Sequence, residues 1–154
     1  AVTATTSSVA EEPPDADINP MIDVGFLVIR STADYDEALQ VVRQASSAFD
    51  ITIDLRSIIY DPAHGLTRPR SDCNLVDAWG GYPCYLPRGR YDEGRYLSIE
   101  RSDAYKSFKP GYFVVIAASG KPGSSEIEQT RQAVRNGFPD AYVKTDKVYF
   151  GCMH

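Results

Sequence analysis

Aromatic and basic side chains gather in one long connection of the chain, residues 62–110. Flat aromatic rings and guanidinium groups suit recognition, because each combines a large apolar area with a polar handle. Such a mixture can stack on sugar faces or anchor a protein interface. The candidate binding residues are Trp79, Tyr82, Tyr85, Arg88, Arg90, Tyr91, Arg95 and Tyr96.

A purely structural use of the same residues stays open. Tyr96 and Trp79 could form a small local core of their own, since both carry large apolar rings. The arginines of the connection would then pair with its acidic residues, which are Asp92, Glu93 and Glu100 among others.

The sequence carries no catalytic signature and predicts a protein that is not an enzyme and needs no cofactor. A serine or cysteine nucleophile needs a positioned base, and the histidines, His64 and His154, lie in no recognised catalytic motif. His64 follows Pro62-Ala63 and precedes Gly65, so we expect an exposed turn residue.

Three cysteines predict one disulfide and one free thiol. Cys73 and Cys84 lie close together in the connection, whereas Cys152 is near the end of the chain. A Cys73–Cys84 bridge would stabilise the fold by about 2–3 kcal/mol and indicates an oxidising compartment. Three reduced cysteines in a cytosolic protein remain the alternative. The cysteines and His154 lack the close cysteine pairs of structural zinc sites, so no metal site is expected.

Charge and composition restrict the partners. The formal net charge of the 154 residues is -5, which argues against a general nucleic-acid binder. Residues 62–110 nevertheless hold eight Lys/Arg against six Asp/Glu, so this insert is locally basic.

No apolar run approaches the roughly 20 residues of a transmembrane helix. Residues 1–20 are rich in Ala, Ser, Thr and Pro and resemble a tether behind a removed export signal, so we expect an exported protein.

We predict a flexible leader over residues 1–22 and a single α+β domain over residues 23–154, with an insert at 62–110. Two similar passages form this domain. In the first, a continuous apolar run at 24–29 predicts a buried strand. Asp34 and Glu37 have the spacing of a capping box and begin a helix that ends near Phe49. Residues 51–55 alternate like a half-exposed strand, which 58–60 continue after a bend.

The second passage repeats this order. Residues 112–117 form the apolar strand, and Ser125 with Glu128 offers another capping box for a helix over 125–136. Residues 142–144 and 148–150 supply a bent or paired strand. Within the insert, residues 95–100 alternate and could add a strand.

Two strand–helix–strand units in succession give βαββαβ, the order of an antiparallel ferredoxin-like sheet with two helices on one face. The alternative is an unrelated α+β sandwich whose halves look alike by chance. The pattern over 24–60 and 111–150 resembles the sporulation-related repeat (SPOR) domain. That resemblance implies a domain that binds peptidoglycan glycan strands lacking stem peptides, usually on the sheet surface.

The long insert departs from the SPOR pattern and could cover that sheet surface. We therefore expect a non-enzymatic, exported, periplasmic or envelope-associated domain that binds peptidoglycan glycan or an envelope protein. The alternative is an inhibitor or immunity-type protein whose Tyr/Arg-rich insert blocks an envelope-directed enzyme. The sequence gives no oligomeric state.

Overall fold

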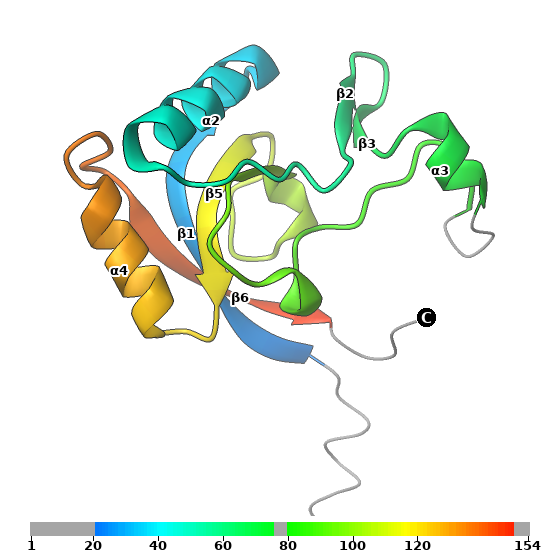
Figure 1. Cartoon of the computed structure of the whole chain (residues 1–154). Helices are drawn as coiled ribbons and strands as arrows, with labels where there is room; N and C mark the ends of the chain where they lie inside the picture. The colour runs from blue at the N-terminus through cyan, green and yellow to red at the C-terminus, as the bar shows by residue number, and fades with distance from the viewer. Residues whose placement is uncertain (1–20, 76–79, 150–154) are drawn as a thin grey trace, which may run out of the picture.

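The computed structural model describes residues 21–75 and 80–149 of the chain (Figure 1). These residues form a four-stranded antiparallel sheet in the order β4-β5-β1-β6, a separate two-stranded hairpin and three α-helices, which confirms the α+β class. The strands of the sheet are β1 (Met21–Thr32), β4 (Ser98–Arg101), β5 (Phe113–Gly120) and β6 (Tyr142–Tyr149). The hairpin strands are β2 (Ile59–Asp61) and β3 (Gly65–Thr67), and the α-helices are α2 (Tyr35–Phe49), α3 (Arg70–Leu75) and α4 (Ser125–Val134). Two short 3-10 helices, η2 (Arg90–Asp92) and η3 (Ser102–Ala104), flank β4 in the chain.

The two apolar runs form the central strands β1 and β5, as their lack of polar alternation predicts. Both faces of β1 are buried: Phe26 and Val28 contact one hydrophobic cluster, and Leu27 and Ile29 contact the other. The first strand begins at Met21, inside the segment that the sequence assigns to the leader. Residues 1–20 lie outside the described part of the chain.

Helices α2 and α4 pack on the same face of the sheet (Figure 1). Gly25 of β1 makes this packing close, because a Cβ there would lie 3.3 Å from Ile127 Cδ1 and 3.3 Å from Pro122 Cα. The predicted two helices on one face are present. The third helix, α3, belongs to the insert.

The predicted capping boxes are both wrong. Asp34 is the N-cap of α2, and its side chain accepts a hydrogen bond from Asp36 N. In a capping box the Glu37 carboxylate would accept from the backbone N of Asp34. Here Thr32 Oγ1 lies between them: it accepts from Asp34 N at 3.1 Å and donates to the Glu37 carboxylate at 2.7 Å. The second helix has Ser124 as its N-cap, with no side-chain capping bond.

The second predicted strand forms only in part. Residues 51–55 make a single parallel bridge, between Ile53 and Leu97, and β4 occupies the position beside β5. The insert thus contributes a strand to the sheet, as the alternation over 95–100 predicts. Residues 59–61 do not continue the sheet but pair with β3, and β6 is one continuous strand.

The other face of the sheet is covered by the insert. Phe26 of β1 contacts Tyr105 and Phe108, with ring centroids 5.1 and 6.4 Å apart. Ser107 Oγ donates to Asp146 Oδ1 of β6 at 3.0 Å, which fixes this segment to the edge of the sheet. The molecule therefore has three layers: two helices, the sheet, and the insert.

Candidate functional site

The insert and the residues just before it include two parts with different surroundings. Residues 59–75 and 80–85, here called the lobe, contain the β2–β3 hairpin and α3 and project away from the sheet (Figure 1). Residues 86–92 and 102–110, here called the cover, lie on the sheet face opposite α2 and α4. Of the predicted binding residues, Tyr82 and Tyr85 lie in the lobe and Arg88, Arg90 and Tyr91 lie in the cover, whereas Arg95 and Tyr96 lie between the two segments of the cover.

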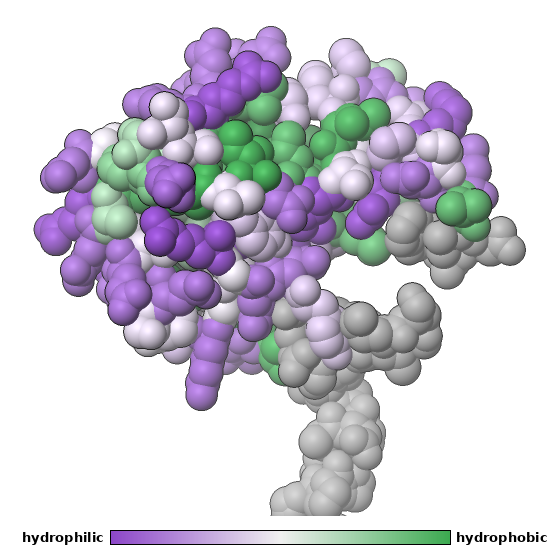
Figure 2. Space-filling view, viewed as in Figure 1, coloured by the Kyte–Doolittle hydropathy of each residue, from purple (hydrophilic) through white to green (hydrophobic). Residues whose placement is uncertain are grey.

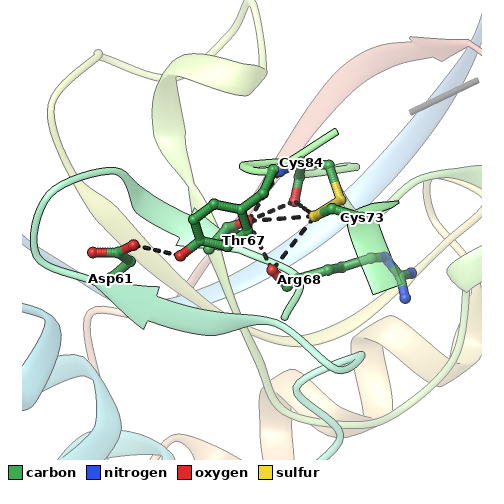
Figure 3. Close-up of a disulfide and its surroundings, with 6 residues drawn as sticks. Asp61, Thr67, Arg68, Cys73 and Cys84 are labelled. Atoms are coloured by element: carbon green, nitrogen blue, oxygen red, sulfur yellow. Dashed lines mark hydrogen bonds between the residues drawn. A yellow bond between two sulfur atoms is a disulfide. The ribbon is translucent and has the colours of Figure 1, made fainter. Parts of the chain in front are cut away.

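A disulfide holds the lobe together, and its pairing is the one that the sequence predicts. Cys73 and Cys84 are bonded with a Cα–Cα distance of 5.6 Å. Thr67 lies beside the bridge: its Oγ1 accepts from Cys84 N at 3.0 Å and donates to the backbone O of Arg68 at 2.9 Å (Figure 3). The bridge therefore connects α3 to the hairpin and to the residues that follow α3.

Asp61 organises the turn of the hairpin. Its carboxylate accepts hydrogen bonds from the Tyr82 hydroxyl and the backbone N of Ala63, and His64 Nδ1 lies 3.0 Å away. The hydrogen bond from Tyr82, followed by the one to His64, holds the pKa of Asp61 well below its usual range. His64 is 43% exposed and lies in the turn, as predicted. Arg70 stacks on the Tyr82 ring at 4.0 Å.

Below the lobe, Glu100 is the centre of a buried polar network. Its carboxylate receives Arg56 Nη2 at 2.6 Å and Arg56 Nε at 3.1 Å, a bidentate pair, and the Tyr85 hydroxyl at 2.6 Å. Burial alone would lower the pKa of the Arg56 guanidinium, but the contact with Glu100 outweighs it and raises that pKa above its usual value. Burial, then Glu100, raises the pKa of Tyr85 well above its ordinary value.

Arg88 is fully buried and points into the molecule rather than toward a ligand. Its guanidinium donates to the carbonyl oxygens of Tyr96 (3.1 Å) and Gly94 (2.8 Å) and to the hydroxyls of Ser98 and Ser119 (3.0 Å each). It also stacks on the Tyr96 ring at 3.6 Å. Burial lowers the pKa of this guanidinium. The side chain ties the cover to β4 and β5.

The remaining predicted residues separate into interior and surface groups. Tyr85 and Tyr96 are half-buried and hydrogen-bonded inside the insert. Tyr91 is 53% exposed, and Arg95 is also exposed. The backbone of Arg90 lies in a short 3-10 helix, Arg90–Asp92. Trp79 lies outside the described residues. Tyr96 thus contacts residues of the insert itself, whereas Tyr91 and Arg95 are exposed at the surface.

An open groove of about 410 Å³ lies beside Tyr91, between the cover and one end of the sheet. Its lining is mostly apolar, and Leu86 at its rim is 46% exposed. Two lysines, Lys106 and Lys147, provide positive charge there, and Lys147 Nζ lies 2.9 Å from Asp23 Oδ1. Arg88 and Asp92 also line the groove. A groove of this size with a mostly apolar lining is typical of a ligand site.

Sequence reasoning does not find several of these residues. Arg56 lies 44 residues before its partner Glu100, so nothing local indicates the pair. Met21 and Lys147 are far apart in the sequence and line the same groove because β1 and β6 pair antiparallel. In this register Met21 lies opposite Tyr149, and Lys147 lies opposite Asp23. Leu86 carries a local signal, since it stands directly beside the interleaved tyrosines and arginines.

Comparisons with known proteins identify no relative: no protein-family model, no curated protein and no solved structure gives a significant match to the chain. Within residues 21–75 and 80–149, no three His, Cys, Asp or Glu side chains are grouped to hold a metal ion. Cys152 and His154 lie outside those ranges. None of the helices in the described part of the chain has the length and apolar character needed to cross a bilayer.

Proposed function

We propose that this protein is a non-catalytic, exported binding domain that recognises a cell-envelope partner through the groove beside Tyr91. A peptidoglycan glycan strand is the first ligand to test. The observation that carries this proposal is the groove itself, where an exposed tyrosine and an exposed leucine stand beside two lysines. The disulfide supports export, because such bridges persist in oxidising compartments.

The arrangement of helices and central strands supports the resemblance to SPOR domains. Two helices cover one face of an antiparallel sheet, and the central strands β1 and β5 are those expected of a ferredoxin-like βαββαβ arrangement. In this interpretation residues 51–55 correspond to the second strand and β4 is an addition from the insert.

The ligand would bind differently from the way that the resemblance implies. Tyr105 and Phe108 occupy the sheet face opposite the helices, so a glycan cannot lie directly on it. The groove lies at the border of this covered area and offers a tyrosine ring for an apolar sugar face. Lys106 suits the free carboxylate of a glycan strand from which the stem peptide has been removed, whereas Lys147 already pairs with Asp23.

Sedimentation with purified sacculi tests this function. The sacculi are compared before and after amidase treatment, which removes the stem peptides. We expect the protein to sediment with the treated sacculi and less with the untreated ones, and to be released as the salt concentration rises. No binding to either preparation would contradict the glycan proposal.

An inhibitor or immunity-type role is the second candidate, and the projecting lobe favours it. The lobe is fixed by its disulfide and presents Leu75, which is 81% exposed. A rigid, protruding segment loses little entropy when it enters an enzyme's active site. A pull-down from envelope extract should then recover one stoichiometric enzyme, and Leu75→Ala should weaken that capture, whereas Tyr91→Ala should not.

A further inference from the structure

The sheet has an open outer edge beyond β4. Residues 51–55 run alongside β4, where Leu97 N donates to Thr52 O at 2.8 Å and Asp54 N donates to Leu97 O at 2.9 Å. In such a parallel bridge the N–H and C=O of the intervening residue, Ile53, point away from the sheet. They have no hydrogen-bond partner within the part of the chain that the structure describes.

This edge is exposed, and one of its exposed side chains is apolar. Ile53 is 40% exposed, and its neighbours Thr52 and Asp54 are exposed as well. Figure 2 shows hydrophobic residues at the surface between α2 and the β2–β3 hairpin, the region into which residues 51–58 lead. Unpaired N–H and C=O groups beside an exposed isoleucine form a template for another strand.

The length of the edge is defined by the backbone. Asp50 and Arg56 both have positive φ, 56° and 58°, which is a left-handed conformation that an extended strand does not contain. An added strand can therefore pair with residues 51–55 and no further.

We propose that a second copy of this chain pairs with this edge, antiparallel and related by a two-fold axis through Ile53. Each Ile53 would then donate its N–H to the other and accept at its C=O, the arrangement of a hydrogen-bonded antiparallel pair. The two Ile53 side chains would lie beside each other, so that each shields the other from water.

The side chains next to Ile53 agree with this register. In a two-fold antiparallel pair about residue 53, Thr52 of one copy lies opposite Asp54 of the other. The only charged side chain within the five-residue edge, Asp54, thus faces a threonine rather than another carboxylate. Two copies of this edge can therefore pair without placing like charges opposite each other. A contact of this size predicts a weak dimer that dissociates on dilution.

Sedimentation equilibrium of the intact chain, from about 10 µM to about 1 mM, tests the association. We expect a reversible monomer–dimer equilibrium that Ile53→Lys weakens at least about tenfold, since two lysines would then face each other. Leu75→Lys, an equally apolar-to-charged change on the exposed surface of α3, should leave the equilibrium unchanged. A chain that remains monomeric throughout, or an equal loss in both variants, would overturn the proposal.

Cysteine cross-linking tests the register directly, in a Cys152→Ser background. An equimolar mixture of Thr52→Cys and Asp54→Cys chains should form disulfide-linked heterodimers under mild oxidation, because residues opposite each other at a non-hydrogen-bonded position lie about 4.5 Å apart. Each variant alone should give much less. Equal cross-linking in all three samples would contradict the two-fold pairing, as would cross-linking in none.

Discussion

Arg88 is a buried cation that the fold surrounds with its own oxygen atoms. Carbonyl and hydroxyl oxygens from the insert and from β4 and β5 accept its hydrogen bonds. Replacing this side chain leaves those acceptors without a donor. We predict that Arg88→Met lowers the free energy of unfolding by about 3–5 kcal/mol, measured by urea denaturation. The exposed Arg95→Met should change it by less than about 0.5 kcal/mol. Similar losses in both variants would contradict this role.

Glu100 and Arg56 form a buried ion pair in which each side chain compensates the charge of the other. Their side chains are 0% and 7% exposed, so either charge alone would be buried without compensation. We predict that Glu100→Gln costs about 3–5 kcal/mol of stability and that Arg56→Met/Glu100→Gln costs less than the sum of its single variants. Denaturant unfolding of the full cycle measures the coupling. Strict additivity of the two changes would show that the pair is not coupled.

Three tyrosines make the stability of the fold decrease at alkaline pH. Burial raises the pKa of Tyr96 to about 12, and raises the pKa values of Tyr85 and Tyr105 well above their ordinary value. Because the folded-state pKa is the higher one, their contribution is fully present below about pH 10, where unfolded tyrosine ionises, and is lost as pH rises above it. Thermal unfolding measured from pH 8 to about pH 12 should show this loss. A transition temperature that does not change across this range would contradict it.

Of the individual residues, those whose role is local could be predicted from the sequence. Asp34 caps a helix, and Cys73 and Cys84 pair within one segment, so neighbouring residues provide the signal. Arg88 and Tyr91 cannot be told apart in this way. Both lie in the same Tyr/Arg-rich stretch, and only the packing of the cover decides that Arg88 faces inward and Tyr91 faces the groove.

At the scale of elements, apolar runs predict β1 and β5, and helical periodicity predicts α2 and α4. The second strand fails for a physical reason. Residues 51–55 alternate correctly, but Arg56 and Ser57 adopt positive φ and the insert supplies β4 to the edge of β5. A local pattern indicates that a segment can form a strand. Which segment pairs with the edge of β5 depends on the whole chain, because several segments compete for that position.

The lobe is an element that its disulfide stabilises separately from the sheet. We predict that reduction, or a Cys73→Ala/Cys84→Ala variant, speeds hydrogen exchange in residues 59–75 and 80–85 while β1 and β5 stay protected. The expected decrease in the free energy of local opening is about 2–3 kcal/mol. Hydrogen-exchange mass spectrometry measures both regions in one experiment. Equal acceleration in the lobe and in the sheet would contradict a separately stabilised lobe.

At the scale of the whole molecule, the insert changes what the scaffold can bind. The two helices cover one face of the sheet and the cover occupies the other, so the surfaces left for recognition are made by the insert and by the edges of the sheet. The groove, the lobe and the edge at Ile53 are three such surfaces. They share no residue, so single substitutions can test them one at a time.

Binding of matched variants to amidase-treated sacculi tests the central claim, that the groove beside Tyr91 recognises the glycan. Tyr91→Ala removes the exposed ring at the groove, and Tyr142→Ala removes a ring of comparable exposure, 41% against 53%, on a part of β6 that does not line it. We predict that Tyr91→Ala weakens co-sedimentation at least about tenfold and that Tyr142→Ala has no effect. Equal binding by both variants and the unmodified protein would contradict the account.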